Sequence, residues 1–246
     1  DVALRELMHA TSDVTFDVHS LLHALSSHLV SQYVPTLLAS LHWIDMLLHK
    51  DAPRVMEVSQ QLWPSMFKCL SNPSEEVVRL DLESLARMVP DTARLEPFCE
   101  LLLALLRTER TLLERRGALI VRQLCELLQP HRVFVTLART LAAEKDIEFA
   151  AQMVQTLNLI ALTSPEAMEL RLLLKASVTS DEGSTLFKTL YPAWAHNPVA
   201  LLSICLIAQA YEHASELVLQ FAAMEISLPF LLQIDKLVQL VEPPVL

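Results

Sequence analysis

The sequence contains very little glycine, and this scarcity excludes several kinds of functional site. Gly117 and Gly183 are the only glycines in 246 residues. Loops that bind phosphate need closely spaced glycines, and the chain has no P-loop, GxGxxG or GxSxG motif. Tight β-hairpin turns also depend on glycine. We therefore expect an all-α protein that has neither a nucleotide-binding loop nor a nucleophile elbow.

Basic charge and long apolar runs are also scarce. The chain has 19 Lys and Arg against 29 Asp and Glu, a formal net charge of -10 and a pI near 5.3. A nucleic-acid backbone would be repelled overall, so we expect no nucleic-acid partner. The longest strongly apolar stretch, residues 199–208, is about half of the ~20 residues that a membrane span requires. We therefore expect no transmembrane helix, although 52% of the residues are hydrophobic.

The cysteines show no metal-binding or disulfide pattern. Cys69, Cys99, Cys125 and Cys205 are far apart in the sequence, and each lies in an apolar stretch with no CxxC spacing. A structural zinc site normally takes closely paired ligands. We expect buried thiols in a reducing compartment, the cytosol or the nucleus, and no metal or cofactor.

Apolar residues recur with a helical period along almost the whole chain. Leu37, Leu41, Ile44 and Leu48 form one stripe, and similar stripes follow after short polar breaks. The repeats start near residues 36, 74, 111, 146 and 184, which are 38, 37, 35 and 38 residues apart, and a further pair follows from residue 212. This spacing is close to that of HEAT repeats. It predicts a single α-solenoid over residues 1–246 with about six antiparallel helix pairs, and residues 1–33 are expected to supply an earlier pair.

Prolines and capping residues predict where several helices begin. In the second repeat the second helix is expected after the break at residues 90–97. Ser164-Pro165 and Asn197-Pro198 each combine an N-cap residue with proline at the first helical position. A glycine within a helix costs about 1 kcal/mol relative to alanine, so Gly117 is expected to allow a neighbouring helix to approach closely. The missing initial methionine and the lack of a polar capping repeat predict a piece of a longer chain.

Histidines and arginines supply the other candidates for a site. His19 and His23 have the i, i+4 spacing of a zincin, but no glutamate follows the first histidine as a base. Metal sites also need a third ligand and supporting groups, so surface or inter-helix positions explain these histidines better. An arginine cluster at the start of the third repeat suits either an acidic partner, a lipid phosphate or a solvated face. It consists of Arg107, Arg110, Arg115, Arg116 and Arg122.

Four segments carry a specific resemblance to a known family. They are residues 114–130 (ERRGALIVRQLCELLQP), 148–166 (EFAAQMVQTLNLIALTSPE), 196–226 and 230–245 (FLLQIDKLVQLVEPPV), with a looser match at 70–86. In these segments the chain resembles the C-terminal region of the vacuole morphology and inheritance scaffold, a HEAT-repeat family that assembles the enzymes making and removing phosphatidylinositol 3,5-bisphosphate. The first 35 residues match least well.

The resemblance implies a non-catalytic scaffold with protein partners. It implies that residues 65–246 bind a Sac-type phosphoinositide 5-phosphatase and self-associate into a homo-oligomer, and that the scaffold helps to recruit the FYVE-finger lipid kinase. It also implies a cytosolic protein that associates indirectly with endosomal and vacuolar (lysosomal) membranes. Polar and aromatic residues beside the apolar stripes of the matched segments are the candidate contacts, because arginine, tyrosine and tryptophan often anchor interfaces. They are Arg115, Arg116, Trp194, His196, Asn197, Tyr211, Glu212, His213 and Lys236.

Each candidate contact also has a purely structural explanation, and two other functions stay open. Asn197 could cap a helix, Trp194 could lie in the core, Tyr211 could pack inside, and Arg115 or Arg116 could be solvated. One alternative function is another HEAT-type adaptor, such as a transport receptor or a phosphatase regulatory subunit. The other is an α-helical metalloenzyme that uses the histidines between His19 and His42.

Overall fold

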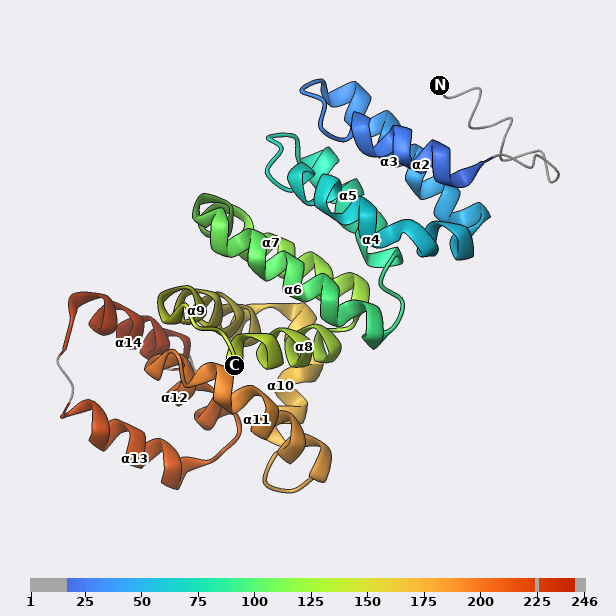
Figure 1. Cartoon of the computed structure of the whole chain (residues 1–246). Coiled ribbons are helices and arrows are strands. Elements are labelled where there is room, and N and C mark those ends of the chain that lie inside the picture. The colour runs from blue at the N-terminus through green and yellow to red at the C-terminus, as the bar shows by residue number, and fades with distance from the viewer. Residues whose placement is uncertain (1–16, 224–225, 242–246) are drawn as a thin grey trace. The chain divides into compact units, whose positions relative to one another are not determined.

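The computed structural model describes residues 17–223 and 226–241, which form thirteen α-helices and one short 3₁₀ helix without a strand (Figure 1). A single helix, α2 (Val18–His28), is followed by six helix pairs. The first members of the pairs are α3 (Val34–Lys50), α5 (Glu75–Arg87), α7 (Arg110–Leu128), α9 (Ile147–Thr163), α11 (Asp181–Trp194) and α13 (Tyr211–Phe221). The second members are α4 (Ala52–Cys69), α6 (Thr92–Thr108), α8 (Pro130–Ala142), the 3₁₀ helix η1 (Pro165–Ala167) continued by α10 (Met168–Lys175), α12 (Pro198–Ile207) and α14 (Leu228–Val241).

The prediction of an all-α chain of helix pairs is confirmed, and most starts agree within three residues. Of the predicted caps, Asn197 Oδ1 accepts the Ala200 N–H at 3.0 Å at the start of α12. Ser164 precedes η1 without a side-chain capping bond. The expected earlier pair is represented by α2, while its first half falls at residues 1–16, outside the described residues.

The predicted start of the second helix after residue 97 is wrong. Helix α6 begins at Thr92, because the Asp91 carboxylate accepts the Arg94 N–H at 2.9 Å and caps the helix there. Pro97 therefore lies inside α6. A capping carboxylate satisfies one of the free N–H groups of the first turn, and here it sets the boundary in place of the proline.

The chain divides into two compact units, residues 1–116 and 117–246, which are described separately. In unit 1, α3 packs against α5 and α2 packs against α4. The rings of Trp63 on α4 and Phe98 on α6 meet edge to face with their centroids 5.6 Å apart. Arg94 on α6 donates to the Met56 carbonyl and the Ser59 hydroxyl on α4 at 2.9 and 3.1 Å, across 38 and 35 residues. Hydrogen bonds at this separation join one repeat to the next.

In unit 2, α11 packs against α8 and α10, and α12 contacts α9, α11, α13 and α14. Helix α12 is apolar around its whole circumference, and residues 199–205 are all buried. Such a helix requires neighbours on every side, so α12 forms the centre of the C-terminal part of this unit.

The four cysteines are free and buried, as predicted. Burial raises the pKa of the Cys69 thiol, and the Asp81 carboxylate adds to the shift, which brings it to about 12. Burial raises the pKa of Cys125 to about 12 and that of Cys205 to about 11. These thiols stay protonated at neutral pH and are poor nucleophiles.

Close backbone packing occurs at Gly183 on α11. A Cβ atom at this position would lie 2.5 Å from the Leu173 carbonyl oxygen, 2.8 Å from the Ser177 nitrogen and 2.9 Å from the Ala176 carbonyl carbon. Gly117 is buried, and its predicted role in close helix approach stays a prediction.

Replacing Gly183 by alanine is expected to destabilise unit 2. All three atoms that the methyl group would meet belong to the backbone, so a rotamer change cannot relieve the overlap. Overpacking of this kind costs about 1–3 kcal/mol, which exceeds the gain of roughly 1 kcal/mol in helix propensity. Thermal unfolding followed by circular dichroism measures the change, with Ser184→Ala as the control. Equal stability of Gly183→Ala and the original chain would contradict this packing.

Asp81 on α5 is a buried carboxylate without a partner. Its exposed fraction is 0%, and neither carboxylate oxygen accepts a hydrogen bond from the described part of the chain. Burial raises the pKa of Asp81 well above its ordinary value. The folded chain therefore holds this proton at pH values at which the unfolded chain has released it.

The stability of unit 1 is expected to fall as the pH rises, because of Asp81. The stabilising contribution is fully present below the pKa of the unfolded state, near 3.9, and is lost as the pH rises through the folded-state pKa. In Asp81→Asn this position cannot ionise, so above that window the variant should be more stable by about 1.4 kcal/mol per unit of pKa elevation. Urea unfolding from pH 4 to 8 measures this difference. The exposed Glu100→Gln is the control, and parallel pH profiles for Asp81→Asn and the original chain would refute the expectation.

Candidate partner-binding surface

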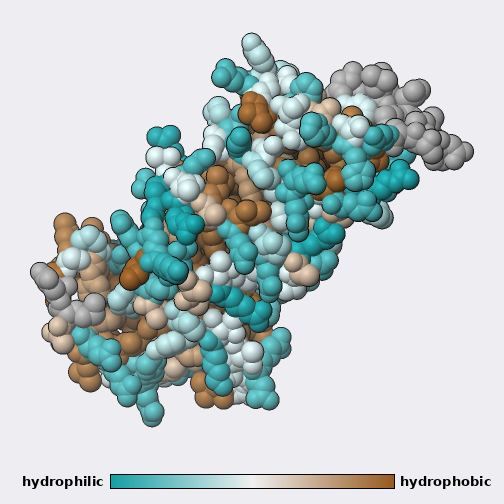
Figure 2. Space-filling view, viewed as in Figure 1, coloured by the Kyte–Doolittle hydropathy of each residue, from teal (hydrophilic) through white to brown (hydrophobic). Residues whose placement is uncertain are grey.

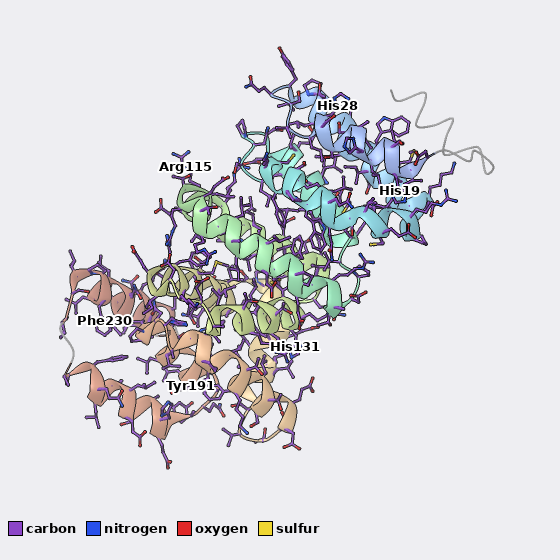
Figure 3. The ribbon with its side chains drawn as sticks, in the orientation of Figure 1. His19, His28, Arg115, His131, Tyr191 and Phe230 are labelled. Carbon is purple, nitrogen blue, oxygen red and sulfur yellow. The ribbon has the colours of Figure 1, made fainter. Side chains whose placement is uncertain are left out.

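The nine predicted contact residues do not form one cluster. Arg115 and Arg116 belong to unit 1, and the other seven belong to unit 2. The Arg115 side chain is exposed at the surface of α7 (Figure 3). The half-buried Arg116 donates to the carbonyls of Leu70 and Pro73 at 3.3 and 3.4 Å, so its guanidinium supports the turn between α4 and α5.

Within the arginine cluster, Arg122 has a partner in unit 2. Its guanidinium pairs with Glu166 at 3.0 Å, and Glu166 is the less exposed of the two side chains. The pair joins α7 to η1. Arg122 and Arg116 are thus engaged within their own units, which weakens the interpretation of the cluster as a free basic surface.

Trp194 is a core residue. Its exposed fraction is 0%, and its ring stacks on Phe134 with the centroids 6.3 Å apart. The indole N–H donates to Asn158 Oδ1 at 3.2 Å, and the Ser203 hydroxyl donates to the same oxygen at 2.5 Å. This buried network links α11, α9 and α12. The structure therefore gives Trp194 the core position that was the alternative to a contact role.

Two other candidates also make bonds inside unit 2. Asn197 is buried and caps α12, and its amide nitrogen donates to Gln233 Oε1 at 3.1 Å. His196 is half-buried, with Nε2 at 3.1 Å from the Leu141 carbonyl oxygen. Both hold neighbouring elements together, so neither is carried forward as a primary contact residue.

Four candidates remain at the surface of unit 2. Tyr211 is 62% exposed, and Glu212 and Lys236 are exposed. His213 is half-buried: its Nε2 lies 2.8 Å from the hydroxyl of Tyr191, which Figure 3 labels on α11, and its Nδ1 lies 3.4 Å from Glu216 Oε2. The aromatic edge of Tyr211 is available to a partner, whereas His213 mainly joins α13 to α11.

The main exposed feature at the C-terminal end of unit 2 is apolar. Val218 and Leu219 on α13 are 51% and 72% exposed, and three leucines on α14 are exposed to a similar degree. Those three are Leu228, Leu231 and Leu232. We call these five side chains the α13–α14 apolar surface. The rings of Phe221 and Phe230 join the two helices at a centroid distance of 5.2 Å, and Figure 2 shows brown, hydrophobic surface over this end of the unit. Large exposed apolar areas commonly mark binding sites for proteins.

The sequence analysis recognised the excess of apolar residues but placed it on the wrong face of α14. The predicted stripe included Leu237, which is 6% exposed, and Val238, which is 43% exposed. The second stripe, Leu228, Leu231 and Leu232, has i, i+3, i+4 spacing and was not singled out. This spacing was the available signal, since a helix with two apolar faces in a thin layer must expose one of them.

The candidate histidines lie beside a groove in unit 1. His19 and His23 on α2 line a groove of about 540 Å³ between α2 and α4, and His19 Nε2 lies 3.5 Å from Glu57 Oε2. His19 and His28 lie at opposite ends of α2 (Figure 3). Among residues 17–223 and 226–241, no three His, Cys, Asp or Glu side chains meet in an arrangement that could hold a metal ion. In the same residues, no helix combines the length and hydropathy needed to cross a membrane.

Comparison with known proteins gives one family and several longer relatives. A family profile that describes the C-terminal binding region of "Vacuolar protein 14" matches residues 110–246. The "Protein VAC14 homolog" of Arabidopsis thaliana is 41% identical over 238 residues, which is 97% of this chain and 32% of that protein. The "Protein VAC14 homolog" of Schizosaccharomyces pombe is 36% identical over 98% of this chain and 30% of its own length.

A third relative is more distant, and the chain is much shorter than all three. "Vacuole morphology and inheritance protein 14" of Saccharomyces cerevisiae is 29% identical over 92% of this chain and 25% of its own length. The chain thus spans about a third or less of the curated relatives it matches. No solved structure matches it significantly.

Proposed function

Because the chain belongs to the Vac14 family, we propose that it is a scaffold segment that binds a phosphoinositide phosphatase of the Sac type through unit 2. The family profile, which is described by the binding of a partner of this kind, begins at residue 110 and so covers the whole of unit 2. Unit 2 also carries the α13–α14 apolar surface. The agreement between these two locations supports the proposal most strongly.

The mechanism that we propose is docking without chemistry on the scaffold itself. Burial of exposed leucines against a partner removes apolar area from water, at roughly 25 cal/mol per Å². The exposed Tyr211 ring, at the start of α13, adds a residue type that often anchors interfaces. In this proposal unit 2 positions the phosphatase, and every reacting group belongs to the bound enzyme.

Two further partners extend the proposal. We propose that the scaffold also supports recruitment of the FYVE-finger phosphatidylinositol 3-phosphate 5-kinase and that it self-associates, so that the kinase and the opposing phosphatase are held in one assembly. Tethering two enzymes raises their effective concentration to the millimolar range for short separations without any new catalytic group. Membrane contact would then be indirect, through partners at endosomal and vacuolar membranes, and the scaffold itself would stay cytosolic.

Calorimetry with purified proteins tests the phosphatase part of this proposal. The chain is titrated into a Sac-type phosphoinositide phosphatase, and a saturable association with a defined stoichiometry is expected. Light scattering on the chain alone tests self-association in the same samples. Titrations without heat, together with separate elution of the two proteins on gel filtration, would exclude the proposed partner.

A further inference from the structure

A small notch opens between α9, α12 and α14 in unit 2. Its volume is about 60 Å³, and its walls are formed by leucine, valine and alanine side chains. Its polar lining consists of Gln155, Asn158, Asn197, Gln233 and Lys236. Lys236 is the charged member of that lining, and no carboxylate of the described residues belongs to it. Apolar walls with a few convergent polar groups are typical of a ligand site.

The buried Asn158 side chain presents a donor to this notch. Asn158 is only 9% exposed, and its Oδ1 accepts hydrogen bonds from both Trp194 and Ser203 in the core. An indole N–H can only donate, so the amide oxygen must face Trp194 and the amide nitrogen must point the other way. This nitrogen has no acceptor among the described residues and is the polar atom that Asn158 has left for the notch.

A second chain of hydrogen bonds fixes Gln233 in the same sense. Asn197 Oδ1 accepts the Ala200 N–H, so the Asn197 amide nitrogen is the atom that donates to Gln233 Oε1, at 3.1 Å. The oxygen of Gln233 is thereby occupied, and its amide nitrogen is left as a free donor. The notch therefore combines two oriented NH₂ groups with the Lys236 ammonium group, while the oxygens of Asn158, Asn197 and Gln233 are all occupied.

We propose that this notch binds the carboxylate of an aspartate or glutamate side chain on a partner protein. A matching ligand must bring acceptor atoms and one negative charge, and it must be only a few atoms in size. A carboxylate meets all three conditions, because it accepts several hydrogen bonds and its single charge balances that of Lys236. A phosphate dianion would bring a second charge that no lining residue balances. The notch also shares α14 with the apolar surface, which suits an acidic side chain flanked by apolar ones.

Propionate and propionamide test the ligand chemistry without any partner. The two probes have the same shape, and only propionate is charged. The side-chain NH₂ resonances of Asn158 and Gln233, in chain labelled with ¹⁵N at Asn and Gln, should shift with propionate and not with propionamide. Lys236→Gln should abolish the response, while Lys188→Gln, which changes an exposed lysine on α11, should keep it. An equal response to both probes, no response, or a stronger response to inorganic phosphate would overturn the proposal.

A binding experiment tests the role of the notch with a protein, and this part rests on the proposed phosphatase partner. Gln233→Glu keeps the acceptor for Asn197 and replaces the free NH₂ by an oxygen. Loss of a charge-assisted hydrogen bond weakens binding about tenfold or more, so Gln233→Glu and Lys236→Gln should each raise the Kd by that factor, and Lys188→Gln should not. If the original chain binds the phosphatase and both variants bind equally well, the notch does not contact this partner. If the original chain does not bind at all, the proposed function fails, while the propionate experiment still decides the chemistry of the notch.

Discussion

Replacing Leu228 and Leu232 together by glutamate is expected to weaken binding of the phosphatase at least a hundredfold, while the chain stays folded. The two side chains are 69% and 60% exposed, so the substitution costs little in the free chain. In the complex it places two carboxylates against an apolar partner surface. Central interface residues contribute about 2 kcal/mol or more each, and two such losses correspond to about three orders of magnitude in affinity. Calorimetry measures the affinity, and circular dichroism checks the fold.

A matched control for this variant lies in the same unit. Met168 and Leu172 on α10 have the same i, i+4 spacing, with exposed fractions of 58% and 57%. Met168→Glu with Leu172→Glu should leave the affinity within a factor of about three, because rim or non-interface positions contribute little. A larger loss in the α10 variant than in the α14 variant would move the docking surface away from α13 and α14.

Replacing Trp194 by alanine is expected to lower the unfolding free energy of unit 2 by about 3–5 kcal/mol. The substitution removes a fully buried ring that stacks on Phe134, and it leaves Asn158 Oδ1 without its indole donor. A loss of this size is a large fraction of the stability of an ordinary domain. Urea unfolding followed by far-UV circular dichroism measures it.

Trp194→Phe separates the ring from its hydrogen bond. Phenylalanine keeps the stacking and loses the indole N–H, so we expect a smaller loss of about 1–2 kcal/mol. Partner binding by the fraction that stays folded should be normal in both variants. A stably folded Trp194→Ala chain that no longer binds the phosphatase would show that Trp194 is a contact residue after all.

The repeat architecture was predictable from the sequence because it depends on local patterns. Apolar periodicity places helices, and capping residues such as Asn197 act on the next few residues of the chain. The error at residue 97 also has a local origin, since proline was given more weight than the Asp91 cap. Tolerance of proline in the first turns depends on which N–H groups are already unpaired, and a cap changes that count.

The candidate site was less predictable because burial depends on tertiary contacts. Trp194 and Tyr211 are both aromatic residues in matched segments, yet one is 0% and the other 62% exposed. What separates them is the position of α12, a helix that is surrounded on all sides, and no local pattern gives that position. The donors of the notch were equally hidden, because the orientation of Asn158 follows from Trp194 and Ser203, residues 36 and 45 positions away.

Hydrogen exchange of the chain, alone and with a Sac-type phosphoinositide phosphatase, tests most directly whether unit 2 docks the enzyme through α13 and α14. The account predicts slower amide exchange in residues 211–221 and 228–241 in the complex, and unchanged exchange in α2 to α5 of unit 1. Protection confined to unit 1, or a complex that forms with no protection in α13 and α14, would contradict it.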